Sequence, residues 1–215
     1  SEMCIRDRNI GAYGVEIKDI FVSCSGYFLN TIEKKKFELN DCQFSYRSSI
    51  FKKSLRNQFI ITEVVLQLSK TNHKISKSYK GINDALNKKK IHNPTIKDIA
   101  RIVSKIRENK LPNPSLIGNS GSFFKNPIVS VAVVNKLKQK FSKMVYFKES
   151  VSKYKLSAAW LIENCNFKNI EEKNVGVYKN QALVIINLGN ATGKEILLFS
   201  EKIKSTVLEL SLIHI

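Results

Sequence analysis

The stretch PTIKDIARIVSKIRENKLPNPSLIGNSGS, residues 94–122, decides how the chain is organised. Its first part begins with the helix-start signal Pro94 and has apolar residues at helical spacing. These apolar residues are Ile96, Ile99, Ile102, Val103 and Ile106. Its second part, 111–122, holds two of the four prolines and two of the nine glycines. It therefore predicts a helix followed by a domain boundary, with domains at 1–111 and 112–215.

Strand patterns dominate the chain before this helix, and strands mixed with helices follow the boundary. The strands expected before it are Val15–Ser23, a hairpin over 26–40 with the charged EKKK at its turn, and Phe59–Ser69. The later elements are helices at Val131–Phe141, Leu156–Cys165 and Thr192–Leu208 and strands at 175–178 and 182–187. Because strands and helices do not alternate regularly, the predicted fold class is α+β.

The formal net charge of +18 raises the question of nucleic-acid binding. Thirty of the 36 basic residues are Lys, scattered over the sequence, with short runs only at 34–36 and 88–90. This pattern indicates a Lys-rich composition more than a phosphate track, so we expect no nucleic-acid partner. A positive field also favours a polyanionic small substrate.

The cysteines and histidines have no metal-ligand spacing, and we expect no metal site. The four cysteines, at 4, 24, 42 and 165, form no CxxC pair and are interpreted as reduced structural thiols. There is no apolar run of membrane-spanning length and no secretory signal pattern at the first residues. We therefore expect a cytoplasmic protein with no membrane partner.

The segment GNSGSFFKNP, 118–127, is the most informative local motif. Its glycines allow a ligand to approach the backbone closely, which would present Ser122 at the tip of a strand, with Asn126 near an anionic or carbonyl group. The alternative is a tight turn that sends Phe123 and Phe124 into the core. The local pattern leaves both interpretations open.

Two other motifs are also open to two interpretations. GAYG, 11–14, could let a flat cofactor touch the backbone at Gly11 and Gly14, or it could be an ordinary turn. Tyr46-Arg47 lies in a loop between strands, where a guanidinium could bind a carboxylate through two parallel hydrogen bonds. The alternative is a surface arginine whose stem covers apolar neighbours.

Five segments in order, NIGAYGVEI, CQFSYRSSIFK, NKLPNPSLIGNSGSFFKNPIV, KLSAAWLIENCNFK and VYKNQALVIINLGNATG, together resemble the UDP-N-acetylenolpyruvoylglucosamine reductase family, first subtype. The resemblance covers about residues 9–208. It implies a vanillyl-alcohol-oxidase-like FAD-binding domain, of which 1–111 is the C-terminal part, followed by an α+β substrate-binding domain. It also implies FAD and NADPH as cofactors, UDP-N-acetylglucosamine enolpyruvate as substrate in peptidoglycan synthesis, and a monomer.

The resemblance also implies roles for residues at matching motif positions. Ser122 corresponds to the family's proton donor at C2 of the enolpyruvyl group, and Arg47 to the residue that polarises its carboxylate and stabilises the enolate. The implied substrate contacts are Tyr46, Tyr79, Lys110, Asn126 and Gln181. The implied cofactor contacts are Ile10, Gly11 and Gly14.

Two features of the family have no counterpart, a Gly-rich FAD segment before Asn9 and a Glu in a strand after the last helix. We expect residues 1–8 and 209–215 to be non-native and this chain, by itself, to be inactive. The alternative function is a non-catalytic UDP-sugar-binding fragment, which a flavin spectrum would distinguish from the enzyme.

Overall fold

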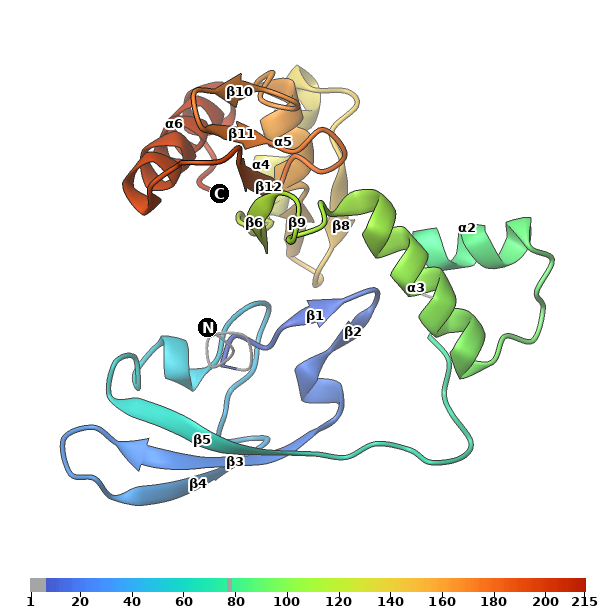
Figure 1. Ribbon diagram of the computed structural model, residues 1–215, viewed down its shortest axis with the longest axis vertical. Coiled ribbons are helices and arrows are strands. Elements are labelled where there is room, and N and C mark those ends of the chain that lie inside the picture. The colour runs from blue at the N-terminus through green and yellow to red at the C-terminus, as the bar shows by residue number, and fades with distance from the viewer. Residues whose placement is uncertain (1–6, 77–78) are drawn as a thin grey trace. The chain divides into compact units, whose positions relative to one another are not determined.

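The chain divides into two compact units, Ser1–Ser104 and Lys105–Ile215. The computed structural model describes residues 7–76 and 79–215 (Figure 1). Cys4 and most of the first segment expected to be non-native lie outside the described residues. The division falls inside a helix and a few residues before the expected boundary, which stays a prediction.

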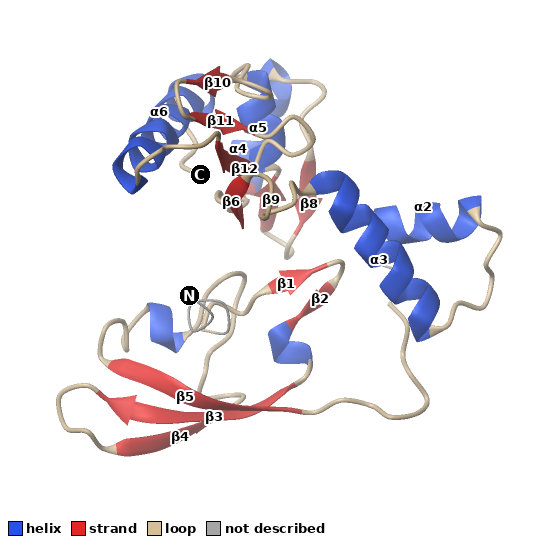
Figure 2. Ribbon diagram, in the orientation of Figure 1, coloured by secondary structure: helices blue, strands red, loops and turns tan. Residues whose placement is uncertain are grey.

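The first unit is built on an antiparallel sheet of three strands in the order β4-β3-β5 (Figure 2). Its strands are β3 (Phe21–Phe28), β4 (Lys34–Glu38) and β5 (Phe59–Leu66). One face carries a small aromatic core with buried Phe21, Phe37 and Phe51. Next to the sheet in the sequence is a hairpin of β1 (Gly11–Ala12) and β2 (Val15–Glu16).

Two expectations about these strands are wrong. The strand expected over Val15–Ser23 is interrupted by a 3-10 turn at Ile17–Asp19, because the Asp19 carboxylate accepts a hydrogen bond from the Glu16 amide, 2.7 Å away. Residues 34–36 lie in β4 and not in a turn. Lysines are tolerated there because β4 is an edge strand, and Lys34 forms an ion pair with Glu63 across the sheet.

Two cysteines that are distant in the sequence lie together in the core of the first unit. Cys24 and Cys42 are 1% and 0% exposed, and both are free thiols. A hydrogen bond from Cys42 lowers the pKa of Cys24, and the same bond, together with burial, raises the pKa of Cys42. The thiol form of Cys42 is therefore favoured at neutral pH.

Helices α2 (Lys80–Lys88) and α3 (Ile96–Lys110) follow the first sheet. The expected helix over 96–110 is confirmed, and α2 was not anticipated. Buried Ile82 and Leu86 of α2 lie one helical turn apart and form its apolar side.

The second unit contains two antiparallel sheets and three helices. One sheet has the order β10-β11-β12-β6 and the other β7-β9-β8. The strands are β6 (Gly118–Ser122), β7 (Ile128–Ser130), β8 (Tyr146–Lys148), β9 (Lys153–Leu156), β10 (Glu171–Glu172), β11 (Val175–Val177) and β12 (Val184–Asn187). The helices are α4 (Val131–Lys140), α5 (Ala158–Asn164) and α6 (Gly193–Ser211). With both units combining helices and antiparallel sheets, the predicted α+β class is confirmed.

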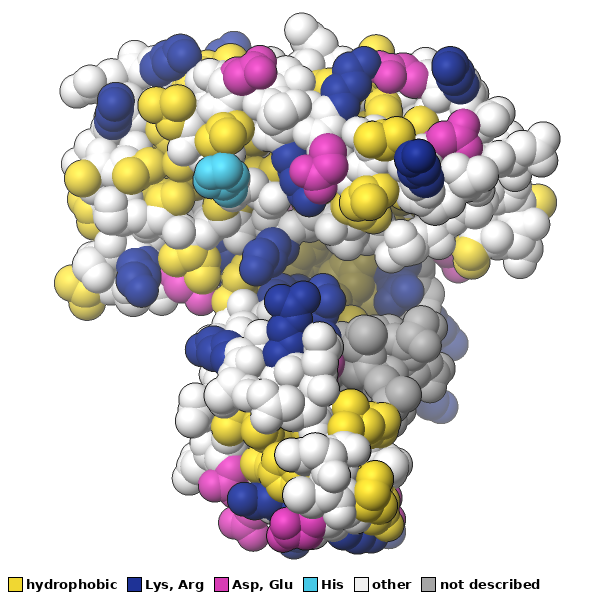
Figure 3. Space-filling view, turned by 90° about the vertical axis from the view of Figure 1, so that its left-hand side faces the viewer, with side chains coloured by type: hydrophobic (Ala, Val, Ile, Leu, Met, Phe, Trp, Pro, Cys, Tyr) yellow, Lys and Arg dark blue, Asp and Glu magenta, His cyan; other side chains and the backbone are white. Residues whose placement is uncertain are grey.

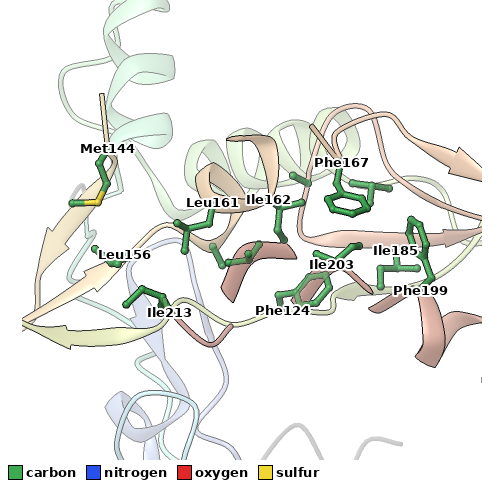
Figure 4. Packing of buried hydrophobic residues seen from close by; sticks show 14 of the residues in the cluster. Phe124, Met144, Leu156, Leu161, Ile162, Phe167, Ile185, Phe199, Ile203 and Ile213 are labelled. Atoms are coloured by element: carbon green, nitrogen blue, oxygen red, sulfur yellow. The ribbon is translucent and has the colours of Figure 1, made fainter. Parts of the chain in front are cut away.

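A single large hydrophobic core holds the second unit together. Figure 4 shows Leu161 and Ile162 of α5, Phe199 and Ile203 of α6 and Ile185 of β12 gathered in one cluster. Ile213 is buried in the same core, and Ile215 packs against it. The expectation that 209–215 is non-native stays a prediction, although these residues contribute to packing.

Within each unit, the face drawn in Figure 3 shows Lys and Arg side chains interspersed with apolar and acidic ones. Among the described residues, no helix is long and apolar enough to cross a membrane. Within the same residues no group of three or more His, Cys, Asp or Glu could hold a metal ion.

Candidate active site

Arg47 lies at the tip of a tight turn in the first unit. Ser45 and Ser48 close this turn with two backbone hydrogen bonds of 2.9 and 3.1 Å. Arg47 has φ of +51°, a left-handed conformation that costs a residue other than glycine about 1–3 kcal/mol. The fold therefore accepts local backbone strain to place this side chain.

The guanidinium of Arg47 is held by backbone carbonyls of Asn9, just before β1, and of Gly11, the first residue of β1. Its Nη1 donates to the Asn9 carbonyl at 3.3 Å, and its Nη2 donates to the Gly11 carbonyl. The Glu16 carboxylate lies 3.7 Å from Nη1, and the Tyr46 ring centroid lies 5.0 Å from the guanidinium carbon. These contacts hold the Arg47 side chain within the protein. Because it is 30% exposed, it is still accessible to a ligand.

Asn9 and Glu16 belong to this group, and residue-by-residue analysis of the sequence did not single them out. Asn9 is fully buried and bonds Glu16, the Ser45 carbonyl and the Lys18 amide through its side chain. Both residues stand in NIGAYGVEI, the first motif of the resemblance. One signal could have indicated them: the Asn9 amide and the Glu16 carboxylate stand on either side of GAYG, the turn expected to contact the cofactor.

The GAYG segment forms the turn of the β1-β2 hairpin. Tyr13 and Gly14 have φ of +55° and +86°, the paired positive values that suit a two-residue hairpin. At Gly11 an added Cβ would lie 2.7 Å from the Val15 carbonyl oxygen, so the hairpin itself requires glycine there. The glycines are thus explained by the turn, and the cofactor contact stays a prediction.

Tyr79 lies immediately before α2, and its ring meets the ring of Tyr13 edge to face, with centroids 5.1 Å apart. The structure therefore brings one expected substrate contact, Tyr79, against the turn that carries the expected cofactor contacts. Edge-to-face pairs of this kind contribute about 1 kcal/mol.

Ser122 ends β6 in the second unit, and its side chain is exposed. Gly121 before it has φ of +72°, stabilised by a 3.1 Å bond from its amide to the Asn119 side chain. Phe124 enters the core at 5% exposure, whereas Phe123 is 38% exposed. Parts of both interpretations of GNSGSFFKNP therefore hold, because the segment presents Ser122 on a strand and anchors it through Phe124.

Gln181 and Lys110 lie near the same strand edge. Val184 pairs with Ser122 across the sheet, and its amide donates to the Gln181 carbonyl at 3.0 Å. Asn180 precedes Gln181 in the sequence, and Asn109 precedes Lys110. The Asn180 side chain donates a 3.0 Å hydrogen bond to the Asn109 carbonyl, which ties the β11-β12 turn to the end of α3. Three expected site residues of the second unit thus share one region.

Asn126 has a structural partner. Its side-chain oxygen accepts a 2.9 Å hydrogen bond from the Ala158 amide in the first turn of α5. Its amide nitrogen is the group left to contact a ligand.

Arg47 belongs to the first unit and Ser122 to the second, so each is placed only within its own unit.

Known proteins resemble both the sequence and the fold. Residues 113–215 match the family described as UDP-N-acetylenolpyruvoylglucosamine reductase, C-terminal domain. Proteins named UDP-N-acetylenolpyruvoylglucosamine reductase are similar over 202 residues, at 49% identity in Flavobacterium johnsoniae and 43% in Amoebophilus asiaticus. These matches cover 94% of the chain but 60% and 59% of the relatives.

A crystal structure of the Thermus caldophilus enzyme of this name matches 94% of the chain and 55% of its own chain, with a TM-score of 0.59. Its sequence identity is 17%, so this match concerns the fold alone. The chain spans about 60% of the length of the curated relatives it matches.

Proposed function

Because this chain belongs to the UDP-N-acetylenolpyruvoylglucosamine reductase family, we propose that it forms part of an enzyme that reduces UDP-N-acetylglucosamine enolpyruvate to UDP-N-acetylmuramate. The reaction uses NADPH and FAD, serves peptidoglycan synthesis and takes place in the cytoplasm, with the enzyme as a monomer. The observation that carries this proposal is the 49% identity over 94% of the chain to a reductase of that name.

FAD would be held in part by Ile10, Gly11 and Gly14. A test of fit comes from the hairpin and the residue before it, where Val15 and Ile10 are 54% and 41% exposed. Exposed apolar side chains beside a turn are suited to a flat aromatic ring. When bound, FAD would supply hydride transfer from NADPH to C3 of the enolpyruvyl group.

Arg47 binds and polarises the substrate carboxylate. Hydride addition at C3 leaves negative charge spread over C2 and the carboxylate, and a fixed donor aimed at that charge stabilises the transition state by about 3 kcal/mol. Among the described residues, the hydrogen bonds of Arg47 use two of its five N–H groups. The remaining N–H groups can meet a carboxylate.

Ser122 donates the proton that C2 receives. A serine hydroxyl is a weak acid in water, so donation requires a strongly basic enolate and a site that excludes water. The end of β6 and the buried Phe124 two residues later hold the backbone that carries this hydroxyl. Protonation at C2 completes the reduction of the carbon–carbon double bond.

The remaining site residues bind the substrate, chiefly its UDP and carboxylate parts. They are Tyr46, Tyr79, Lys110, Asn126 and Gln181. Lys110 ends α3, and its ammonium group suits a diphosphate. Asn126 offers its amide nitrogen, because its oxygen is engaged by Ala158.

A chimera tests the proposal. The parts of the Flavobacterium johnsoniae relative that lie outside the aligned 60% are joined to this chain, and the intact relative serves as the control. We expect substrate-dependent NADPH oxidation and a product two hydrogens heavier than the substrate. Substrate binding without NADPH oxidation would favour the alternative, a non-catalytic UDP-sugar-binding piece. A folded chimera with neither property would refute both functions.

A further inference from the structure

The Glu16 side chain is held by two residues other than Arg47. Its Oε2 accepts a hydrogen bond from the Asn9 side chain at 3.0 Å and lies 3.1 Å from the Lys18 ammonium. Its Oε1 lies 3.7 Å from Arg47 Nη1. The carboxylate is therefore a fixed anchor whose second oxygen faces the guanidinium.

Asn9 connects this anchor to the turn that carries Arg47. It is fully buried, and its Nδ2 donates to the Ser45 carbonyl at 3.1 Å as well as to Glu16. Its own backbone carbonyl accepts from Arg47. One buried amide thus joins the backbone of the Arg47 turn to the carboxylate that faces Arg47.

Glu16 alone does not neutralise the two cations that it contacts. Lys18 and Arg47 contribute two positive charges, and Glu16 contributes one negative charge, so the three side chains retain one net positive charge. Glu16 can orient Arg47 without cancelling its attraction for a carboxylate. A carboxylate bound to Arg47 alone would neutralise it.

We propose that Glu16 is a positioning residue that, together with Asn9, holds the guanidinium of Arg47 in the orientation that receives the substrate carboxylate. This inference rests on the proposed function. Glu16 acts on one edge of the guanidinium and leaves the other N–H groups to the ligand. Its effect is on orientation and not on the reacting atoms.

The ligand-free chain provides the first test. The chain has six arginines, so the side-chain nitrogens of Arg47 can be assigned by ¹⁵N-arginine labelling and comparison with Arg47→Lys. We expect slow rotation of the guanidinium in the unmodified chain and rotation about three- to fivefold faster in Glu16→Gln, as for a partly exposed ion pair. Glu63→Gln, which removes the exposed ion pair with Lys34, is the matched control and should leave Arg47 unchanged.

The same labelled proteins are then titrated with UDP-N-acetylglucosamine enolpyruvate. We expect Glu16→Gln to raise the Kd by about three- to fivefold. If Glu16→Gln disturbs the amide signals of the hairpin, Glu16→Asp, which keeps the charge, is used and should restore slow rotation in part.

Three results would overturn the inference. These are fast rotation in the unmodified chain, equal rotation in Glu16→Gln, and tighter binding by Glu16→Gln, which would make Glu16 a competitor of the substrate. If the substrate shifts the NMR signals of Arg47 neither in the unmodified chain nor in the variants, this result counts against the proposed function. The rotation rates without ligand would still decide the role of Glu16.

Discussion

Arg47 combines a strained backbone with a well-held side chain. Its left-handed φ is the kind of cost that persists only where surrounding contacts determine the conformation, and Asn9, Gly11 and Glu16 supply those contacts. A lysine at position 47 could not make the same contacts, because one ammonium group cannot span two carbonyls and a carboxylate in a planar arrangement. The planar shape of the guanidinium therefore suits the contacts that it makes within the protein.

Arg47→Lys in the chimera should lower kcat/KM by about 100-fold, with the loss mainly in kcat, because the stabilised charge develops in the transition state. Steady-state kinetics with UDP-N-acetylglucosamine enolpyruvate measure this. Arg56→Lys, at an exposed position of the same unit, is the control and should behave like the unmodified chimera. A raised KM at unchanged kcat would reassign Arg47 to ground-state recognition.

Ser122→Ala should lower the steady-state turnover of the chimera by about 10²- to 10⁴-fold, the usual contribution of a positioned proton donor. Ser120→Ala is a close control, since Ser120 lies two residues earlier in β6 and is also exposed. Turnover by Ser122→Ala within a factor of about two of the unmodified chimera, a difference of less than 1 kcal/mol, would rule out Ser122 as the donor.

At this scale the resemblance assigns roles to Arg47 and Ser122, which stay predictions, but it does not reveal the residues that surround them. Arg47 and Ser122 stood in motifs that resemble a known family, whereas Asn9 and Glu16 act through a buried hydrogen-bond network. Such a network depends on residues 36 positions apart, such as Asn9 and Ser45, and no local pattern predicts which side chains it joins.

Among the secondary-structure elements, β3 and β5 approach each other closely at Gly26. A Cβ added to Gly26 would lie 1.9 Å from the Ile60 carbonyl oxygen. Gly26→Ala should therefore destabilise the first unit by about 3 kcal/mol or more, because backbone must move. Amide hydrogen exchange in β3 and β5 measures the loss.

Gly193→Ala is the control for that prediction. Nothing lies within 4 Å of a Cβ added to Gly193, which begins α6 in the second unit. We expect the stability of the second unit to change by less than about 1 kcal/mol. Unchanged exchange rates in β3 and β5 of Gly26→Ala would show that the sheet does not pair as described.

The start of α6 is stabilised by a capping box. Thr192 Oγ1 accepts from the Glu195 amide and donates to Glu195 Oε2, at 3.3 and 2.8 Å, and the Thr192 amide donates to the same carboxylate at 2.8 Å. Hydrogen bonds from the Thr192 backbone and then its side chain hold the pKa of Glu195 below its ordinary value. This capping interaction stabilises the helix most when Glu195 is ionised.

Thr192→Ala should cost the second unit about 1 kcal/mol near neutral pH. It should also raise the pKa of Glu195 part of the way toward its ordinary value, because the larger contribution, from the backbone amide, remains. A depressed carboxylate pKa gives stability that is present above the unfolded pKa and lost as the pH falls through the folded pKa. The difference between the two proteins should therefore shrink in acid.

Denaturant titrations at several pH values measure this difference. Ser205→Ala, at an exposed site within the same helix, is the control and should be neutral or slightly stabilising. An equal or larger loss from Thr192→Ala in acid would contradict the assigned role of the Glu195 carboxylate.

Most of the longer helices were predictable from sequence, whereas α2 and several of the short strands were not. Residues 96–110 form the expected helix because apolar spacing and start signals agree. Leu156 was expected in a helix but lies in β9, because Ser157 caps α5 by accepting a 3.2 Å hydrogen bond from the Trp160 amide. The β7-β9-β8 sheet was missed, whereas the equally short β11 and β12 were expected, because β11 and β12 consist mainly of buried apolar residues.

At the scale of the whole molecule, the two units differ in their cores. The second unit has a large core that includes α5, α6 and the β12 sheet, whereas the first unit has a small aromatic core. We expect the 215-residue polypeptide, tested alone, to purify without flavin, to show no substrate-dependent NADPH oxidation and to retain weak UDP binding. A flavin absorption spectrum and calorimetry with UDP check this, and a yellow, active preparation would contradict it.

The central claim is that Arg47 and Ser122 act on the enolpyruvyl group of the substrate. The most direct test is an anaerobic comparison of the two half-reactions in the chimera and in its Arg47→Lys and Ser122→Ala variants. We predict that NADPH reduces bound FAD at similar rates in all three proteins, while turnover of UDP-N-acetylglucosamine enolpyruvate by the reduced proteins is slowed about 100-fold or more in both variants. Equal rates of substrate reduction in all three proteins would contradict the account.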